Sequence, residues 1–167
     1  MIQLTDIKDI SPKEIQHFAN NYSIKRNLRD SFPFPYLTED AQTFLELVSA
    51  GVMGHVFAIV SNNNFIGIGS LIPQNHEHRI NAEIGYWIGE PYWGGGYATT
   101  AVKLLVQFAF ENLDITRVYA YVYGFNHASM RVLEKSGFQK EAILQSSVIK
   151  EGKLYDEHLY SISNDRI

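Results

Sequence analysis

The stretch WGGGYATTA, residues 93 to 101, places three consecutive glycines directly before a long amphipathic segment. Glycine inside regular structure costs about 0.5–1 kcal/mol relative to alanine, so a triplet needs a local reason. One reason is a backbone turn that no side chain tolerates. The other is a ligand that must contact bare peptide groups, since a helix N-terminus presents unpaired N–H groups and a partial positive charge.

Hydrophobic periodicity predicts a mixed α/β (α+β) chain around this triplet. Ser11 and Glu14 form a capping box around Pro12, and Thr38 is predicted to cap a second helix. After residue 22 the first helix is expected to fray or kink towards Leu28, ahead of a stiff aromatic-proline loop at residues 31–36. The predicted helices are residues 12–22, 38–51, 98–113 and 128–135, and the predicted strands are residues 56–60, 65–72, 81–89, 117–123, 139–149 and 154–162. No linker or repeat interrupts the pattern, so residues 1–167 are predicted to form a single domain with a sheet flanked by helices.

Composition excludes several classes of function. The formal net charge of −4 and the absence of a basic run argue against a nucleic-acid partner. With no cysteine, the chain has no disulfide, thiolate metal site or cysteine nucleophile. Neither a signal peptide nor a run of 18 apolar residues is present, so no membrane role is predicted and a reducing cytoplasm is the expected location.

The familiar phosphate-binding motifs fit the glycine triplet poorly. A P-loop requires Lys and Ser or Thr after its last glycine, and no Lys follows Gly96. A dinucleotide fingerprint starting at Gly94 would require glycine or alanine at position 99, where the chain has Thr99. A different phosphate-binding mode is therefore needed.

Three motifs, in order, resemble a known family. Residues 82–99, AEIGYWIGEPYWGGGYAT, resemble the acetyl-CoA motif of the GNAT acetyltransferases, with Trp93, Gly96 and Ala98 at its first, central and last places. Residues 126–138, NHASMRVLEKSGF, and the loop of residues 28–36, LRDSFPFPY, are similar to the subgroup of ribosomal-protein N-terminal acetyltransferases. The resemblance spans about residues 2 to 162.

This resemblance implies a fold and a co-substrate. The fold is a mixed, mostly antiparallel sheet flanked by helices, in which residues 81–89 and 117–123 splay apart to bind acetyl-CoA. No metal is expected. The pantetheine arm should pair with the strand edge at Trp87, Ile88 and Gly89 and hydrogen-bond Asn126. The residues expected around the pyrophosphate are Trp93, Gly94, Gly95, Gly96, Tyr97, Ala98 and Thr99.

Glu83 is the candidate general base. By strand alternation it shares a face with Gly85 and Trp87, and burial is expected to make it a stronger base. An α-amine, with a pKa of about 7.7–8.0, needs less help from a base than a lysine at about 10.4. The alternative is a carboxylate in a plain salt bridge.

Ser129 is the candidate acid for the leaving thiolate, as the resemblance implies. Many relatives carry Tyr where this chain has Leu133, which favours the serine. The alternative is a hydroxyl at a helix start, three residues after Asn126. One departure is Thr100, where the subgroup usually has Glu, and it leaves the role of that carboxylate open.

Aromatic residues are expected to wall the acceptor pocket, with ordinary core packing as their alternative. This prediction covers Phe32, Phe34, Tyr36, Tyr86 and Trp87. Asp30 is a candidate to attract a cationic amine. The residues from His76 to His78 are interpreted as a solvated turn, not a metal site.

The favoured function is acetyl-CoA-dependent transfer to a protein N-terminal α-amine. The alternatives are the same chemistry on a small amine, such as an aminoglycoside or polyamine, and a CoA-binding module without turnover. Monomer and homodimer both stay open.

Overall fold

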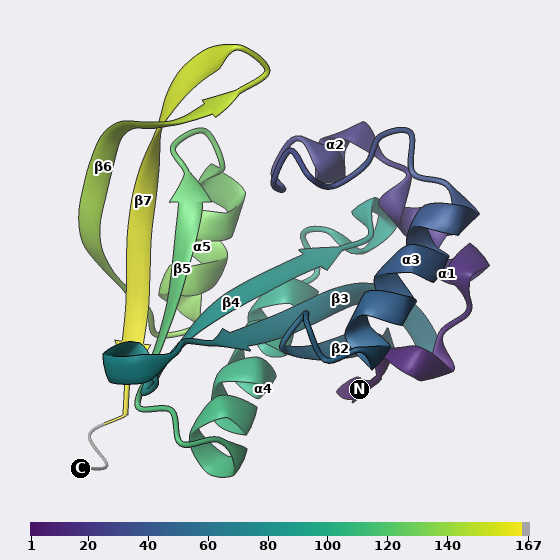
Figure 1. Ribbon diagram of the computed structural model, residues 1–167, viewed down its shortest axis with the longest axis horizontal. Helices are drawn as coiled ribbons and strands as arrows, with labels where there is room; N and C mark the ends of the chain where they lie inside the picture. Colours follow the sequence, from purple (N-terminus) through teal and green to yellow (C-terminus); the bar gives the residue numbers. More distant parts are fainter. Residues whose placement is uncertain (165–167) are drawn as a thin grey trace.

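A seven-stranded sheet crosses the computed structural model, which describes residues 1–164 (Figure 1). The strand order is β1-β2-β3-β4-β5-β7-β6, and only β4 and β5 run parallel. The predicted mixed, mostly antiparallel sheet is therefore confirmed. The strands are β1 (Ile2–Asp6), β2 (His55–Ser61), β3 (Asn64–Pro73), β4 (Asn81–Ile88), β5 (Arg117–Tyr123), β6 (Gln139–Lys150) and β7 (Lys153–Ser163).

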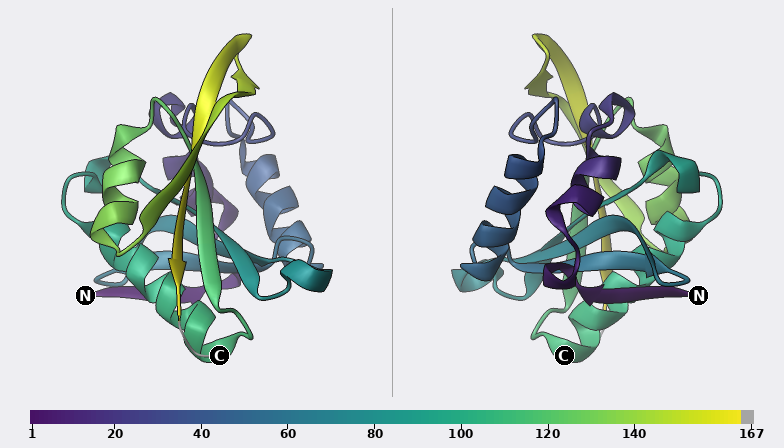
Figure 2. Two further views of the ribbon diagram at one scale, coloured as in Figure 1. Left: turned by 90° about the vertical axis from the view of Figure 1, so that its left-hand side faces the viewer. Right: turned by 90° about the vertical axis from the view of Figure 1, so that its right-hand side faces the viewer.

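Helices cover both faces of the sheet (Figure 2). One face carries α1 (Pro12–Ala19), α2 (Tyr22–Lys25) and α3 (Thr38–Ser49), and the other carries α4 (Tyr97–Asn112) and α5 (His127–Lys135). Each face has its own hydrophobic core, with Leu105 and Leu133 fully buried on the α4 side and Ile15 and Ala41 on the α3 side. Within residues 1–164, no helix is long and apolar enough to cross a lipid bilayer.

Strands β4 and β5 pair over only three positions. Asn81 aligns with Arg117, and the pairing ends where Glu83 meets Tyr119. Beyond that point the strands diverge, which leaves a wedge-shaped opening in the middle of the sheet (Figure 1). The predicted splay is confirmed, and Glu83 lies at its apex.

The N-terminal strand β1 is absent from the sequence-based prediction, which was wrong here. Its five residues pair with β2 from Ile2 opposite Ser61 to Asp6 opposite Phe57. A strand this short gives too little alternation to be recognised, and its stability comes from a partner more than fifty residues away in the chain.

The first helices also differ in detail from the prediction. The capping box of Ser11 and Glu14 is confirmed, but α1 ends at Ala19 and a separate α2 begins after Asn21, whose side chain accepts from the Ser23 N–H. Asn21 thus acts as a new cap, so the chain restarts a helix where the sequence suggested fraying.

Thr38 does not cap α3. The N-cap residue is Leu37, and its N–H donates to the Asp40 carboxylate at 2.7 Å. The Thr38 hydroxyl instead donates to Gln16 of α1 at 3.0 Å, which ties the two helices together. A tertiary contact therefore takes the hydroxyl that the local sequence assigned to the cap.

Two hairpins have tight turns with left-handed residues. Asn62 and Asn63 have φ of 49° and 64°, and Glu151 and Gly152 have φ of 49° and 76°. Positive φ at both central residues is typical of the type I′ turn that joins twisted antiparallel strands. The second turn closes the β6–β7 hairpin, which projects beyond the rest of the sheet (Figure 1).

The tip of this hairpin is fastened to the segment around α2. Lys150, only 5% exposed, donates to the Leu28 carbonyl and to the Asp30 carboxylate at 3.0 Å. Beside it, the Tyr22 hydroxyl donates to Glu151 at 2.9 Å. These contacts join the tip of the C-terminal hairpin to the N-terminal segment around α2.

Candidate active site

The structure explains why each position of the triplet requires glycine. Gly94 and Gly96 have φ of 78° and 77°, a left-handed conformation that side chains rarely adopt. A Cβ on Gly95 would lie 2.5 Å from the Tyr97 ring. The steric explanation for the glycines therefore holds at all three positions.

The same loop leaves its peptide groups bare. The first hydrogen bond of α4 runs from Thr100 N–H to Gly96 C=O, so within residues 1–164 the N–H groups of residues 94–99 donate to no protein acceptor. No atom lies within 4 Å of a Cβ built at Gly94 or Gly96. A set of unpaired donors at the start of a 16-residue helix is suited to an anion, so both reasons for the glycines apply together.

A cavity of about 1120 Å³ joins this loop to the opening between β4 and β5 and to the face under α3. It brings together most of the residues that the sequence singled out. Those that line it are Phe32, Tyr36, Glu83, Tyr86, Trp87, Ile88, Trp93, Gly94, Gly96, Tyr97, Ala98, Thr99, Asn126 and Ser129.

Asp30 and Phe34 lie outside this lining. The Asp30 carboxylate is paired with Lys150, and this neighbour holds the pKa of Asp30 below its usual value, first through a hydrogen bond and then through charge. Phe34 is 49% exposed and packs edge-to-face on Tyr22. In this structure Asp30 therefore helps to fasten the tip of the β6–β7 hairpin, and Phe34 packs on α2; neither lines the cavity.

Gly89 differs from its predicted place at the cofactor edge. Its N–H donates to the Ile66 carbonyl of β3 at 2.7 Å, and a Cβ there would lie 2.6 Å from the Phe18 ring. Because strand peptide groups alternate between neighbours, Trp87 also faces β3, whereas Tyr86 and Ile88 face the opening. Gly89 is needed for packing against Phe18.

The end of β4 is tied to the glycine loop by Trp93. The Trp93 indole N–H donates to the Ile88 carbonyl at 2.7 Å. This acceptor faces the opening, so the peptide groups on β4 left free to meet an extended ligand are those of Tyr86 and the N–H of Ile88.

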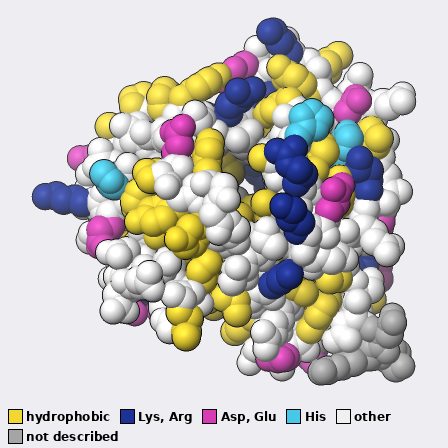
Figure 3. Space-filling view, turned by 180° about the vertical axis from the view of Figure 1, so that it is seen from behind, with side chains coloured by type: hydrophobic (Ala, Val, Ile, Leu, Met, Phe, Trp, Pro, Cys, Tyr) yellow, Lys and Arg dark blue, Asp and Glu magenta, His cyan; other side chains and the backbone are white. Residues whose placement is uncertain are grey.

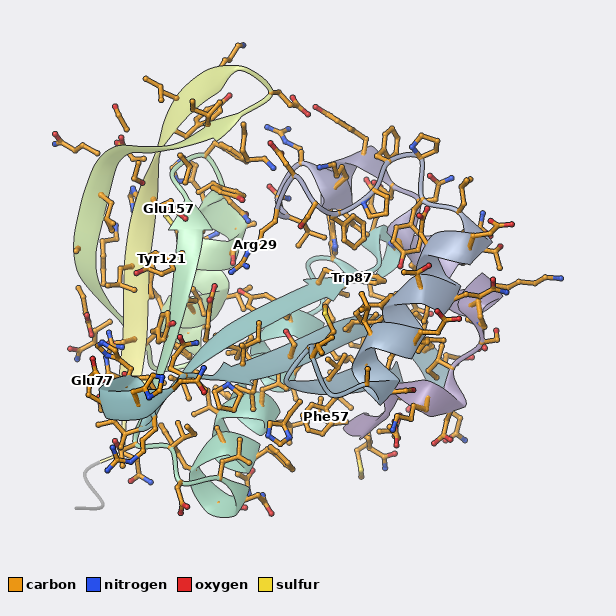
Figure 4. The ribbon with its side chains drawn as sticks, in the orientation of Figure 1. Arg29, Phe57, Glu77, Trp87, Tyr121 and Glu157 are labelled. Atoms are coloured by element: carbon orange, nitrogen blue, oxygen red, sulfur yellow. The ribbon has the colours of Figure 1, made fainter. Side chains whose placement is uncertain are left out.

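Glu83 lies at the apex of the opening and is paired with Arg29. The guanidinium and carboxylate are 2.7 Å apart, with side-chain exposures of 69% for Arg29 and 21% for Glu83. Glu83 is therefore only partly buried. The salt bridge that was the alternative to its role as general base is present. Figure 4 shows Arg29 reaching into the space between β4 and β5.

Two hydroxyl groups meet at the opposite wall of the cavity. The Tyr86 hydroxyl of β4 lies 2.7 Å from the Ser129 hydroxyl of α5. Burial raises the pKa of Tyr86 to about 12, although the hydrogen bond with Ser129 acts in the other direction. The phenol is therefore protonated at neutral pH and can donate.

Asn126 is the N-cap of α5, where its side-chain oxygen accepts from the Ser129 N–H at 3.2 Å. That bond fixes the first turn of the helix and hence the position of Ser129. Leu133, at the place where many relatives carry Tyr, is fully buried and outside the cavity lining. Thr100 is exposed and donates to the Gly96 carbonyl at 3.3 Å, so it stabilises the first turn of α4.

Sequence reasoning missed several residues of the cavity. Arg131 and Lys135 lie three and seven residues after Ala128, which puts the three on one face of α5, and this spacing was the signal available. Lys and Arg side chains gather beside a hollow on this face of the molecule (Figure 3). The missed residues of the lining also include Tyr123 and, labelled in Figure 4, Arg29, Tyr121 and Glu157.

A metal centre finds no support in the described part of the chain. Within residues 1–164, no three His, Cys, Asp or Glu side chains are arranged to hold a metal ion. His76 to His78 form a short exposed 3-10 turn.

The donor set fits a phosphorylated, amide-bearing thioester carrier. Bare N–H groups at residues 94–99 and the cations Arg131 and Lys135 suit phosphates. The free peptide groups at Tyr86 suit an extended amide chain, and the Tyr86–Ser129 pair offers hydroxyl hydrogens deeper in the cavity. These are the chemical parts of acetyl-CoA in the order in which they are joined.

Comparison with known proteins decides the family. Residues 5–139 match the model of the acetyltransferase (GNAT) domain. The chain belongs to the GNAT acetyltransferase family. A full-length GNAT relative is the SPbeta prophage-derived uncharacterized N-acetyltransferase YokL of Bacillus subtilis, 30% identical over 162 residues, which is 95% of this chain and 89% of that protein.

Solved structures of GNAT proteins share the fold. Mycobacterium smegmatis RimJ in complex with CoA-disulfide aligns with a TM-score of 0.87 at 21% identity, covering 99% of this chain and 83% of that one. Spermidine N-acetyltransferase from Vibrio cholerae in complex with CoA and spermine gives a TM-score of 0.79 at 22% identity, covering 98% and 94%. The protein is an acetyl-CoA-dependent GNAT N-acetyltransferase. The names of solved structures with this fold include a spermidine acetyltransferase and a ribosomal L7/L12 alpha-N-protein acetyltransferase.

Proposed function

We propose that this GNAT enzyme acetylates the N-terminal α-amine of a peptide chain. The observation that carries this choice is the state of the cavity's carboxylates. In residues 1–164 the lining contains Asp40, Glu83 and Glu157, and each already has a protein partner. Asp40 accepts from the Leu37 N–H, Glu83 from Arg29 and Glu157 from the Ser147 hydroxyl.

A polyamine is disfavoured by this arrangement. Each further ammonium of a polyamine would require a carboxylate beside the reacting amine that is not already paired with a cation. Asp40 and Glu157 keep their charge, because their Leu37 and Ser147 partners are neutral, whereas the carboxylate at the apex of the opening does not. Glu83 is already neutralised by Arg29, whose own positive charge lines the acceptor side of the cavity. A single amine near its neutral form fits better than a chain of cations.

The loop and α5 would hold the co-substrate. The N–H groups of residues 94–99 face the pyrophosphate, Arg131 and Lys135 add positive charge, and the peptide group of Tyr86 faces the pantetheine. When bound, acetyl-CoA supplies an acetyl thioester whose carbonyl carbon is open to an amine. These contacts fix the position of the thioester relative to β4.

Glu83 takes a proton from the acceptor, directly or through a water. An α-amine, with a pKa of about 7.7–8.0, gives up its proton more readily than a lysine amine at about 10.4, so it is the easier substrate for a carboxylate base. Arg29 would help to orient the carboxylate across the opening.

Ser129 donates its hydroxyl hydrogen to the departing sulfur. Either hydroxyl can donate across the 2.7 Å contact. In the proposed step the Tyr86 phenol, which is protonated at neutral pH, donates to the Ser129 oxygen. The Ser129 hydrogen is then left to point elsewhere, into the cavity. Tyr86 is a positioning residue that acts through Ser129.

The test measures thiol release from acetyl-CoA with four acceptors. These are a peptide with a free N-terminus, the same peptide with a blocked N-terminus and one internal lysine, spermidine and an aminoglycoside. We expect turnover with the free N-terminus and at least a hundredfold lower kcat/KM with the others. Faster turnover of spermidine or the aminoglycoside than of any peptide would overturn the proposal.

A further inference from the structure

The cavity extends into a space beneath α3 on the acceptor side of the sheet. Register pairs Val56 of β2 with Ser70 of β3, and Ser70 with Gly85 of β4, so these three residues form one row across this face. Ser70 and Gly85 are small, and a Cβ on Gly85 would already lie 3.1 Å from the Ser70 hydroxyl. No large side chain rises from the middle of this row to fill the space.

The walls of this space are apolar. The neighbouring row carries Ile68 and Trp87, which face each other across β3 and β4. Phe44 of α3 and the stacked pair Phe32 and Tyr36 line the cavity from above. Trp87 projects from β4 near α3 (Figure 4), and it belongs to the core cluster on that side.

Glu83 stands at the open end of this pocket. It lies two residues before Gly85 on the same face of β4, a separation of about 7 Å along a strand. When the acceptor nitrogen lies beside Glu83, a substituent on the adjacent carbon can therefore extend towards Ser70 and Gly85. The pocket is within reach of the first side chain of a peptide acceptor.

The polar side chains on this side of the cavity are at its edges and on its floor: Asp40 and Thr43 of α3 and Ser70 of β3. The Ser70 hydroxyl lies 3.5 Å from the Gly85 carbonyl, and Asp40 accepts from the Leu37 N–H. A charged or hydrogen-bonding side chain entering the pocket would lose its water without a compensating bond. An apolar side chain of matching size would instead gain from burial.

We propose that the space bounded by Ser70, Gly85, Ile68, Trp87 and Phe44 is a subsite for an apolar side chain next to the reacting amine. The preferred acceptors are then peptides that begin with Leu, Met or Phe. This inference rests on the proposed function, because it presumes a peptide α-amine at Glu83.

The first experiment compares peptides of one sequence that differ only at the first residue. Leu, Met and Phe are compared with Gly, Ser and Asp at that position, with kcat/KM measured by thiol release. Burial of a side chain of this size corresponds to about a ten- to hundredfold preference. Equal or higher kcat/KM for the Ser or Asp peptide would overturn the subsite while leaving the peptide function intact.

The second experiment fills the pocket. Ser70→Leu places a large side chain on its floor and is expected to lower kcat/KM at least tenfold for the Leu and Phe peptides, with the Gly peptide changed less than threefold. The matched control is Ser163→Leu, the same change at an exposed position of β7 outside the cavity. An unchanged preference in Ser70→Leu, with thermal unfolding showing a folded protein, would overturn the proposal.

Two small amines separate the possible failures. Turnover of spermidine with no peptide reacting would overturn the proposed function and the subsite together. Turnover of 2-phenylethylamine with no peptide reacting would overturn the peptide acceptor but support the apolar subsite. A preference for Leu, Met and Phe peptides over both amines supports both.

Discussion

The Tyr86 hydroxyl of β4 lies 2.7 Å from the Ser129 hydroxyl of α5, across the wedge between β4 and β5. This contact links β4 to α5 at the place in the cavity where the leaving sulfur is expected. Asn126 caps α5, and its side-chain oxygen accepts a hydrogen bond from the Ser129 N–H. The pair is the feature of the site whose function is easiest to test.

Tyr86→Phe and Ser129→Ala should both lower kcat with little change in the KM for acetyl-CoA. General acids contribute about 10²–10⁴-fold, so Ser129→Ala is expected to cost about a hundredfold and Tyr86→Phe about tenfold. Because Tyr86 acts through Ser129, the double variant should match Ser129→Ala alone. Multiplying losses in the double variant would contradict this.

A matched control and a pH profile accompany that series. Tyr160→Phe removes a buried tyrosine hydroxyl that donates to Glu134 at 2.9 Å outside the cavity, and it should leave kcat unchanged. With its pKa raised to about 12 by burial, Tyr86 stays protonated to about pH 10, so its contribution to the rate should be flat across that range. A fall in the Tyr86-dependent rate near neutral pH would argue against this role.

Glu83→Gln should lower kcat about a hundredfold or more, because the acceptor ammonium loses its proton acceptor. Glu77→Gln, in the exposed turn after β3, is the matched control and should leave activity unchanged. Arg29→Met should shift the melting temperature little, since its salt bridge is 69% exposed on the arginine side. Full activity in Glu83→Gln would remove Glu83 from the mechanism.

Gly96→Ala should weaken CoA binding beyond its effect on stability. Alanine in a left-handed conformation costs about 1–2 kcal/mol of folding free energy, so the loop is expected to rearrange and misalign its N–H groups. Gly51→Ala is the control, because Gly51 has φ of 76° with no atom within 4 Å of its Cβ and lies outside the cavity. Thermal shift with CoA should fall for Gly96→Ala only; equal protection of both variants would show that the loop does not bind phosphate.

Arg131→Gln and Lys135→Gln should each raise the KM for acetyl-CoA about tenfold with kcat nearly unchanged. Hydrogen bonds to charged groups contribute about 1.5–3 kcal/mol, and screening should make the effect smaller at high salt. Lys103→Gln on α4, outside the cavity lining, is the control. Binding is readable by intrinsic fluorescence, since both tryptophans, Trp87 and Trp93, line the cavity.

Lys150→Met should loosen the clasp between the β6–β7 hairpin and the α2 segment. It removes the ion pair with Asp30 and leaves the Leu28 carbonyl unpaired, so hydrogen exchange at residues 22–30 and 148–155 should speed up. The folded pKa of Asp30 lies below 3.8, so the pair contributes fully above that pH and is lost as pH falls through the lower folded value. Asp30→Asn should therefore abolish that acid-dependent change, and a persistent change would assign it elsewhere.

Local signals in the sequence were sufficient to predict most helices and strands, and to identify the glycine loop, Glu83 and Ser129 as candidate site residues. The glycine triplet before a long amphipathic segment identified bare amides at a helix start, because that pattern depends on conformational freedom within a few residues. Alternation placed Glu83, Gly85 and Trp87 on one face of a strand. The motif at residues 126–138 placed Ser129 at a helix start in the same way.

Tertiary structure decided what those residues touch. Arg29 reaches Glu83 across 54 positions of sequence, Lys150 reaches Asp30 across 120, and Tyr86 meets Ser129 across 43. The edge strand β1, the packing role of Gly89 beneath Phe18 and the small floor at Ser70 likewise depend on register between distant segments. Spacing in a chain fixes periodicity and backbone freedom, but only folding determines which charge, ring or hydroxyl comes to stand opposite another.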